Sequence, residues 1–151
     1  MKRRHFLQTG LMLTIAALAP QAAMAGKEKV FTGLVKGTGA GGYDVVSYFS
    51  GTPAQGNADI TSEWDGVTWR FSSAANKAAF DANPEQYAPV FGGYCAYAVA
   101  NGYTAKGDPE AWSVIDGKLY LNYSTGIRVK WLKDVPGNIS AGNANWPKVL
   151  E

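Results

Sequence analysis

Cys95 is the only cysteine in this chain of 151 residues, and it lies in the segment FGGYCAYAVANG, which runs from Phe91 to Gly102. A single thiol supports soft-metal ligation, covalent catalysis or redox exchange. Tyr94 and Tyr97 flank the cysteine and are the candidate contacts to a bound cofactor. Burial in the core is the alternative role, because free cysteine packs as a small hydrophobe.

The side chains that usually assist a thiol are confined to the first 25 positions. The lone histidine is His5, and the three methionines are Met1, Met12 and Met24. Copper(I) and zinc prefer thiolate, thioether and imidazole ligands, so the rest of the chain offers one soft donor. A cysteine nucleophile also needs a neighbouring base. We therefore expect a protein that is not an enzyme, in which Cys95 contacts copper, another soft metal or a small cofactor.

Residues 1–25 have the features of a signal peptide, with a basic start, a short apolar run and small residues before a cleavage site after Ala25. Arg3 and Arg4, followed by Phe6 and Leu7, resemble the twin-arginine export signature. An ordinary Sec signal is the alternative. The apolar run is far shorter than the roughly 18 residues that span a bilayer. We expect a soluble periplasmic protein with no integral membrane segment after cleavage.

Cleavage would change the charge of the chain. Three of the 14 basic residues lie in the signal and all 12 acidic residues lie beyond it, so the net charge changes from +2 to −1. This balance argues against nucleic acid as a partner. The remaining residues are enough for one compact domain, and a single cysteine allows no internal disulfide.

Two Asp-Gly pairs, at 65–66 and 116–117, are each flanked by alternating apolar and polar residues and predict β-hairpins. Serines at 72, 73 and 124 predict caps for helices that follow each hairpin. The second of these helices is expected to end at Pro136-Gly137, and 139–146 to be helical or irregular.

Residues 30–35 predict an edge strand, and the glycine-rich segment 37–42 predicts a flexible loop. Hairpins and helices are interspersed without a βαβ order. The predicted fold class is therefore α+β, a small single domain with two Asp-Gly hairpins and short helices packed on the sheet. No internal repeat is recognised in the sequence.

Several motifs together resemble the YHS domain family. They are YDVVSYF at 43–49, WDGVTWRFSS at 64–73 and FDANPEQY at 80–87. The cysteine segment, GDPEAW at 107–112 and ANWP at 144–147 are similar to the longer, exported branch of that family. The resemblance implies a leader with a Gly-rich loop at 26–42 and a YHS-like domain with a C-terminal extension at 43–151.

The resemblance also implies a metal-associated module, but this sequence departs from the family's metal-binding pattern. Ser47 and Phe49 stand where that pattern has a cysteine and a methionine, and Ser72 and Ala75 stand where it has two cysteines. The family's fold can therefore be expected here, whereas its ligand set cannot.

Two further functions remain open from the sequence. The chain can be a protein- or ligand-binding module in which Cys95 is a buried core residue, or a thiol redox protein. The partner is then an unknown protein or small molecule. A dimer is a further possibility, in which two Cys95 thiols share one copper ion.

Overall fold

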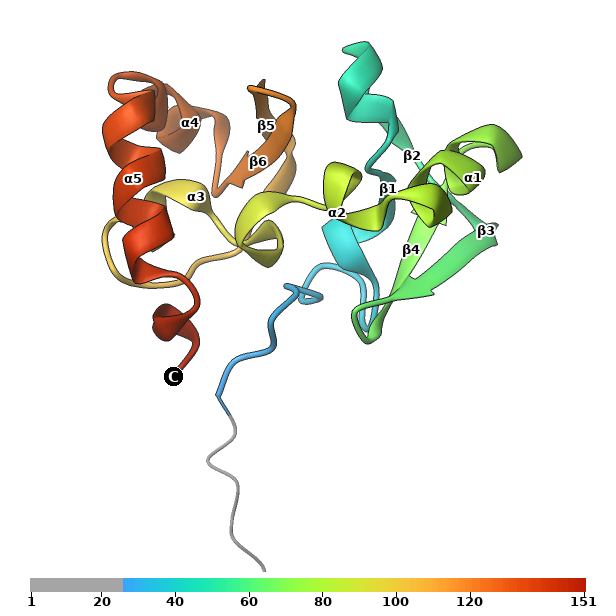
Figure 1. The fold of residues 1–151 in the computed structure, drawn as a ribbon, viewed down its shortest axis with the longest axis horizontal. Helices are drawn as coiled ribbons and strands as arrows, with labels where there is room; N and C mark the ends of the chain where they lie inside the picture. Colours follow the sequence, from blue (N-terminus) through green and yellow to red (C-terminus); the bar gives the residue numbers. More distant parts are fainter. Residues whose placement is uncertain (1–25) are drawn as a thin grey trace, which may run out of the picture.

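The computed structural model describes residues 26–151, which form an α+β fold of short helices and three two-stranded antiparallel sheets (Figure 1). The predicted fold class is confirmed. The export-signal prediction, with Arg3, Arg4, Phe6, Leu7 and cleavage after Ala25, lies outside the described residues.

Each predicted Asp-Gly pair forms the turn of a hairpin. Asp65 and Gly66 have φ of 53° and 79°, and Asp116 and Gly117 have φ of 50° and 74°, as a type I′ turn requires. The three strand pairs are β1 (Tyr43–Asp44) with β2 (Ala54–Gln55), β3 (Asn57–Trp64) with β4 (Val67–Phe71), and β5 (Asp108–Ile115) with β6 (Lys118–Asn122).

A helix follows each of the two longer hairpins, and a serine caps it as predicted. The hydroxyl of Ser73 accepts from the amide of Asn76, and that of Ser124 accepts from the amide of Ile127, both at 3.1 Å. The helices are α1 (Ala74–Ala82), α2 (Pro84–Tyr87), α3 (Ala96–Ala100), α4 (Thr125–Leu132) and α5 (Val135–Asn145), with short 3-10 turns η1 (Gly39–Gly42), η2 (Ser47–Ser50), η3 (Val90–Gly93) and η4 (Lys148–Leu150).

Two local predictions are wrong. Pro136 and Gly137 do not end a helix but lie in the first turn of α5, where a proline is tolerated because the first amides have no helical partner. The carboxylate of Asp134 caps this turn by accepting from the amide of Gly137 at 3.0 Å. Residues 30–35 form no strand beyond one isolated bridge at Val35.

The glycine-rich segment is part of the packed body and not the flexible loop that its composition suggests. Gly39, Ala40 and Gly42 are buried, and Thr38 forms a bridge with Thr68 of β4. This segment continues into β1, so the body of the fold begins before the expected domain boundary at residue 43.

The structure contains an internal repeat that the sequence did not reveal. We call residues 39–83 the first half and residues 90–134 the second half. β3 and β5 begin at Asn57 and Asp108, which are 51 positions apart (108 − 57), and the same spacing relates η1 to η3, β4 to β6 and the start of α1 to the start of α4. The register shift in each hairpin also falls at equivalent positions.

The backbone angles confirm the repeat residue by residue. Ala40, Gly41 and Gly42 have φ of 50°, 59° and 81°, and their equivalents in the second half, at 91–93, have φ of 59°, 62° and 81°. Asn83 and Asp134, which follow α1 and α4, have φ/ψ of −155°/77° and −149°/73°. Three positive φ values in a row are uncommon, so this agreement marks a shared local fold.

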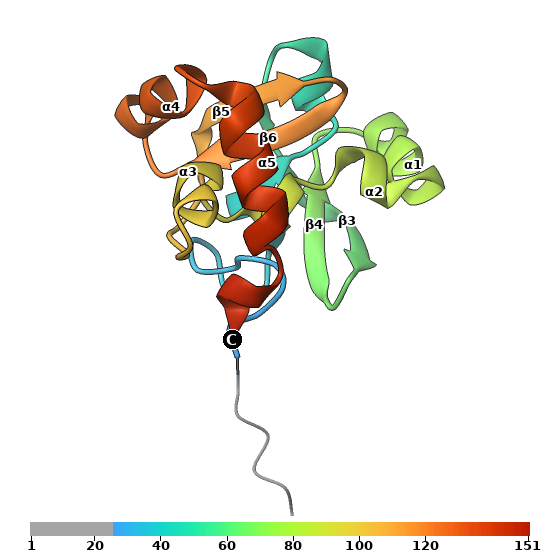
Figure 2. The same ribbon diagram turned by 60° about the vertical axis from the view of Figure 1, so that its left-hand side comes forward.

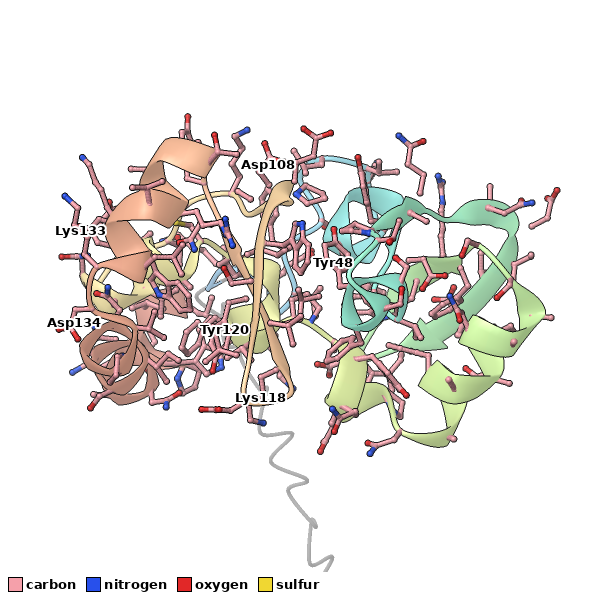
Figure 3. The ribbon with its side chains drawn as sticks, turned by 90° about the horizontal axis from the view of Figure 1, so that it is seen from above. Tyr48, Asp108, Lys118, Tyr120, Lys133 and Asp134 are labelled. Carbon is pink, nitrogen blue, oxygen red and sulfur yellow. The ribbon has the colours of Figure 1, made fainter. Side chains whose placement is uncertain are left out.

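The two halves lie side by side (Figure 1), and their buried hydrophobic residues form two clusters, one of which contains residues from both halves. Leu119 and Leu121 of β6 pack with the first half, whereas Tyr120 packs with the helices of the second half. Successive side chains along β6 therefore point to opposite sides, and both faces of this hairpin are covered. Figure 3 shows Tyr48 on one side of the β5–β6 hairpin and Tyr120 on the other.

Helix α5 begins 51 positions after α2 and is longer, with 11 residues where α2 has 4. It packs beside α3 and α4, and it crosses in front of the β5–β6 hairpin in Figure 2. Trp146, directly after α5, packs on Phe91 and Tyr94 at ring-centroid distances of 5.8 and 6.1 Å. Within residues 26–151, no helix has both the length and the apolar character needed to cross a membrane.

Candidate functional site

Cys95 lies between η3 and α3 and is the N-cap of α3. Its sulfur accepts from the amide of Ala98 at 3.4 Å, and its own amide donates to the carbonyl of Ala105 at 2.9 Å. The side chain is only 1% exposed. A thiol replaces the oxygen that usually caps a helix, so this sulfur has a structural role.

Asn122 is the polar neighbour of Cys95 and comes from the end of β6. Its amide oxygen accepts from the amide of Tyr97 at 3.0 Å and from the Cys95 thiol at 3.6 Å. The side chain is fully buried, and its Nδ2 has no hydrogen-bond partner among the described residues. A buried donor without an acceptor costs about 1–3 kcal/mol, so this amide marks an incompletely satisfied interior.

The two tyrosines proposed as cofactor contacts lie elsewhere. The hydroxyl of Tyr94 donates to the carbonyl of Glu28 at 2.7 Å, and its ring packs on Phe31. Burial, and then the negative charge of Glu28, raise the pKa of the Tyr94 phenol. Tyr97 donates its backbone amide to Asn122, and its ring packs against the core cluster that contains Tyr120 and Trp131. The structure therefore does not bring either ring together with the thiol in a common pocket.

A pocket of about 210 Å³ opens above the sulfur instead, and we call it the Cys95 pocket. Two tyrosines flank it, Tyr103 and Tyr123, which are 54% and 47% exposed. The ammonium of Lys106 lies 5.0 Å from the centroid of the Tyr123 ring. Its lining is Cys95, Ala98, Tyr103, Ala105, Tyr123 and Ile127. Apart from the thiol and the two phenols, this lining is apolar.

The equivalent position in the first half is filled by a hydrogen-bonded carboxylate. Asp44 is fully buried. Its Oδ1 accepts from the amides of Val46 at 2.9 Å and Ser47 at 3.2 Å. Its Oδ2 accepts from the amide and hydroxyl of Ser72, at 2.8 and 2.6 Å, and from Nδ2 of Asn76 at 2.8 Å.

The repeat explains how the Cys95 pocket arises. Of the positions that build the polar cluster in the first half, three carry smaller or apolar side chains in the second, and the fourth carries a tyrosine. The replacements, each 51 positions along the chain, are Asp44 by Cys95, Ser47 by Ala98, Ser72 by Tyr123 and Asn76 by Ile127. Four of the residues that line the Cys95 pocket are therefore equivalent to the residues that form the hydrogen-bonded cluster around Asp44.

Sequence reasoning found Cys95 but missed Tyr103 and Tyr123. Tyr123 directly precedes the helix cap Ser124, and Tyr103 follows Gly102, which has φ of 85°. Their equivalents in the first half, Ser72 and Thr52, are polar. Comparison of the two halves is the signal that would have identified both tyrosines.

The donors around the thiol do not fit a soft metal. In the described part of the chain, no group of three or more His, Cys, Asp or Glu side chains could hold a metal ion. The nearest polar side chain to the sulfur is the amide of Asn122, which is not a soft ligand. A shared site in a dimer would need a thiol that reaches the surface, and Cys95 is buried.

Known proteins give no further guide to this site. Comparison of the chain with family models, with curated proteins and with solved structures gave no match. The internal comparison of the two halves therefore carries the argument about function.

Proposed function

We propose that this protein is an exported, non-enzymatic, YHS-like module that binds one small, largely apolar molecule in the Cys95 pocket. The observation that carries the proposal is the contrast between equivalent positions. Where the first half has a saturated cluster around Asp44, the second half has an opening lined by Ala98, Ala105 and Ile127. Because hydrogen-bonded side chains occupy the equivalent positions in the first half, the pocket is a specific feature of the second half.

The size and lining of the pocket define the ligand. Sites for drug-sized ligands usually have volumes of about 300–1,000 Å³, and the Cys95 pocket is smaller at about 210 Å³. It therefore suits a molecule of about one aromatic ring. Tyr103 and Tyr123 supply aromatic faces at the rim, and the thiol supplies a soft contact at the floor.

The other candidate functions fit the surroundings of Cys95 less well. Copper or another soft metal would find one soft donor, which the Asn122 amide and the Ala98 amide already engage. A redox protein that cycles through an internal disulfide needs a second thiol, and this chain has one cysteine. A periplasmic location remains part of the proposal and rests on the signal-like residues 1–25.

Access of reagents to the native thiol tests the proposal. We expect the neutral aromatic disulfide 4,4′-dithiodipyridine to modify Cys95 in the folded protein, while the dianionic Ellman reagent reacts only after denaturation. Ala105→Leu fills the pocket and should slow the first reaction, whereas Ala54→Leu at the equivalent position of the first half should not. Saturating indole should protect the thiol in the wild-type protein and not in the Ala105→Leu variant.

Two results would reject the proposal. In one, both reagents react with Cys95 only above the denaturation midpoint, which means that no small molecule reaches the pocket. In the other, elemental analysis of natively exported protein finds one equivalent of copper or zinc that Cys95→Ser removes, which establishes metal binding instead.

A further inference from the structure

A second pocket lies where the two halves meet, and we call it the junction pocket. It has a volume of about 210 Å³ and does not include Cys95. The turn end of the first hairpin contributes Trp64 and Asp65, and the segment between the halves contributes Glu85. The second half contributes Phe91, and the N- and C-terminal segments contribute Lys29 and Trp146.

Aromatic rings from both halves line the junction pocket and are held in place by their neighbours. Trp64 packs on Trp69 at 6.1 Å between ring centroids, and Trp69 donates through its indole nitrogen to the carbonyl of Trp64 at 3.0 Å. On the other side, Trp146 packs on Phe91 at 5.8 Å. Trp64 and Trp146 are half-buried, so part of each indole remains available to a ligand.

One carboxylate of the junction pocket has no ion-pair partner within residues 26–151. Lys29 pairs with Asp65 at 2.8 Å, and the side chain of Asp65 is only 28% exposed. Glu85 lies in the first turn of α2 and forms no ion pair with any residue in the range 26–151. The side chains that line the pocket therefore carry a net charge of −1, beside two indole rings.

We propose that the junction pocket binds a small organic cation, such as a protonated amine or a quaternary ammonium group. Indole faces attract cations through their quadrupole, and trimethylammonium groups are recognised in this way in aromatic cages. The exposed carboxylate of Glu85 supplies the opposite charge at the rim of the pocket. A neutral sugar would gain nothing from the excess negative charge.

The second half contains a matched pocket that lacks these features. It is lined by Ile115, Asp116 and Tyr120, which are equivalent to Trp64, Asp65 and Trp69, and it also includes Lys118. The positive charge of Lys118 balances the negative charge of Asp116, and the Tyr120 side chain is buried. The repeat therefore provides an internal control in which no cation should bind.

Choline and its uncharged carbon analogue 3,3-dimethyl-1-butanol test the proposal on the mature chain. The protein has five tryptophans, and their indole N–H signals can be followed by NMR. We expect choline to shift the signals of Trp64 and Trp146 and to leave those of Trp112 and Trp131 unchanged. Glu85→Gln and Trp64→Leu should each weaken choline binding about fivefold, whereas Asp116→Asn in the matched pocket should not.

Several outcomes would overturn the proposal. They are equal binding of 3,3-dimethyl-1-butanol and choline, binding of glucose at the same indoles, or choline affinity that is unchanged in Glu85→Gln. Cys95→Ser tests the junction pocket separately from the proposed function of the Cys95 pocket. It should abolish labelling in the Cys95 pocket and leave choline binding intact, so either site can fail without the other.

Discussion

The two halves of this protein share the order and spacing of their hairpins and caps but have different interiors. In the first half, the buried carboxylate of Asp44 accepts five hydrogen bonds. In the second half, the thiol of Cys95 and the amide of Asn122 share the equivalent place and make fewer and longer bonds. Turns and caps fix the path of the chain, so the side chains inside that path are free to change.

The difference extends to the balance of polar groups. Among the described residues, the two buried side-chain nitrogens without a partner are Asn122 Nδ2 and Trp131 Nε1, and both belong to the second half. Their equivalents in the first half are Phe71 and Phe80, which pack together at 5.0 Å. The candidate ligand pocket thus lies in the half with the less complete interior, as functional regions often do.

The largest expected effect comes from removing the buried carboxylate of the first half. Asp44→Ala leaves several donors without an acceptor and should lower the free energy of unfolding by about 3–5 kcal/mol. Cys95→Ala at the equivalent position removes one weak cap and should cost about 1–2 kcal/mol. Urea unfolding of both variants measures the difference, and equal losses would show that the two interiors are equivalent in energy.

The sequence predicted those parts of the fold that depend on neighbouring residues. Asp65-Gly66 and Asp116-Gly117 specify their own turns, because positive φ is accessible to aspartate and glycine. Ser73 and Ser124 cap the helices that begin one residue later. Each signal lies within a few residues of its effect, so one sequence suffices to find it.

The repeat and the Cys95 pocket depend on contacts that sequence patterns do not reveal. Identity between the halves is concentrated at turns and caps, such as Gly41-Gly42-Tyr43 and Gly92-Gly93-Tyr94, while core residues such as Phe80 and Trp131 differ. Asn122 meets Cys95 from 27 positions away. The pocket depends on the volumes of side chains such as Ala98. This difference in volume can be recognised only when Ala98 is compared with its equivalent, Ser47.

Gly41 and Gly92 are equivalent glycines with the same backbone conformation but different neighbours, so alanine at the two positions compares the effect of those neighbours. Both have φ near 60°, so alanine at either position pays about 1–2 kcal/mol for the left-handed conformation. A Cβ at Gly92 would also overlap the backbone carbonyl oxygen of Lys29, whereas one at Gly41 would meet the side chains of Leu34 and Pro109, each at 3.1 Å.

Gly92→Ala should therefore destabilise the protein by about 1–3 kcal/mol more than Gly41→Ala does. Thermal unfolding of the two variants checks the order. Because the Gly92 carbonyl accepts from the amide of Phe31 at 2.9 Å, hydrogen exchange at Phe31 should also accelerate in Gly92→Ala alone. The reverse order would show that the N-terminal segment adds nothing to the second half.

Alkaline pH should affect the contact between the halves. Burial raises the pKa of Tyr48 far above the ordinary value, with further contributions from Tyr43, Asp108 and Glu110. The raised pKa means that the stability is fully present below the unfolded value of 10.0 and is lost as the pH rises further. In the native state the Tyr48 hydroxyl donates to the carbonyl of Pro109 at 2.7 Å, across the halves.

Absorbance at 295 nm, followed during alkaline titration, should therefore show Tyr48 ionising together with unfolding. Tyr48→Phe loses the bond to Pro109, at a cost of about 1 kcal/mol at neutral pH, and should show a weaker dependence of stability on pH above 10.0. Tyr103→Phe is the control, since the Tyr103 side chain is 54% exposed. An unchanged alkaline midpoint in Tyr48→Phe would contradict this account.

The smallest expected effect concerns a pair of equivalent serines. Ser62 donates to Asp81, whereas Ser113 accepts from Arg128 at 2.8 Å. Hydrogen bonds from Lys77 and then Ser62 lower the pKa of Asp81 from its usual 3.8. The stability from this carboxylate is therefore present above pH 3.8 and is lost as the pH falls through the lowered pKa.

Asp81→Leu places in the first half the residue found at the equivalent position of the second half, Leu132. Because the Asp81 side chain is 44% exposed, the loss at neutral pH should be below about 1 kcal/mol. Part of the acid dependence of stability should disappear with it. Arg128→Met in the second half should leave the acid dependence unchanged, because no carboxylate takes part in the Ser113 contact. Urea unfolding at pH 3 and pH 7 compares the two variants. If the acid dependence of stability is lost in Arg128→Met and kept in Asp81→Leu, the prediction is wrong.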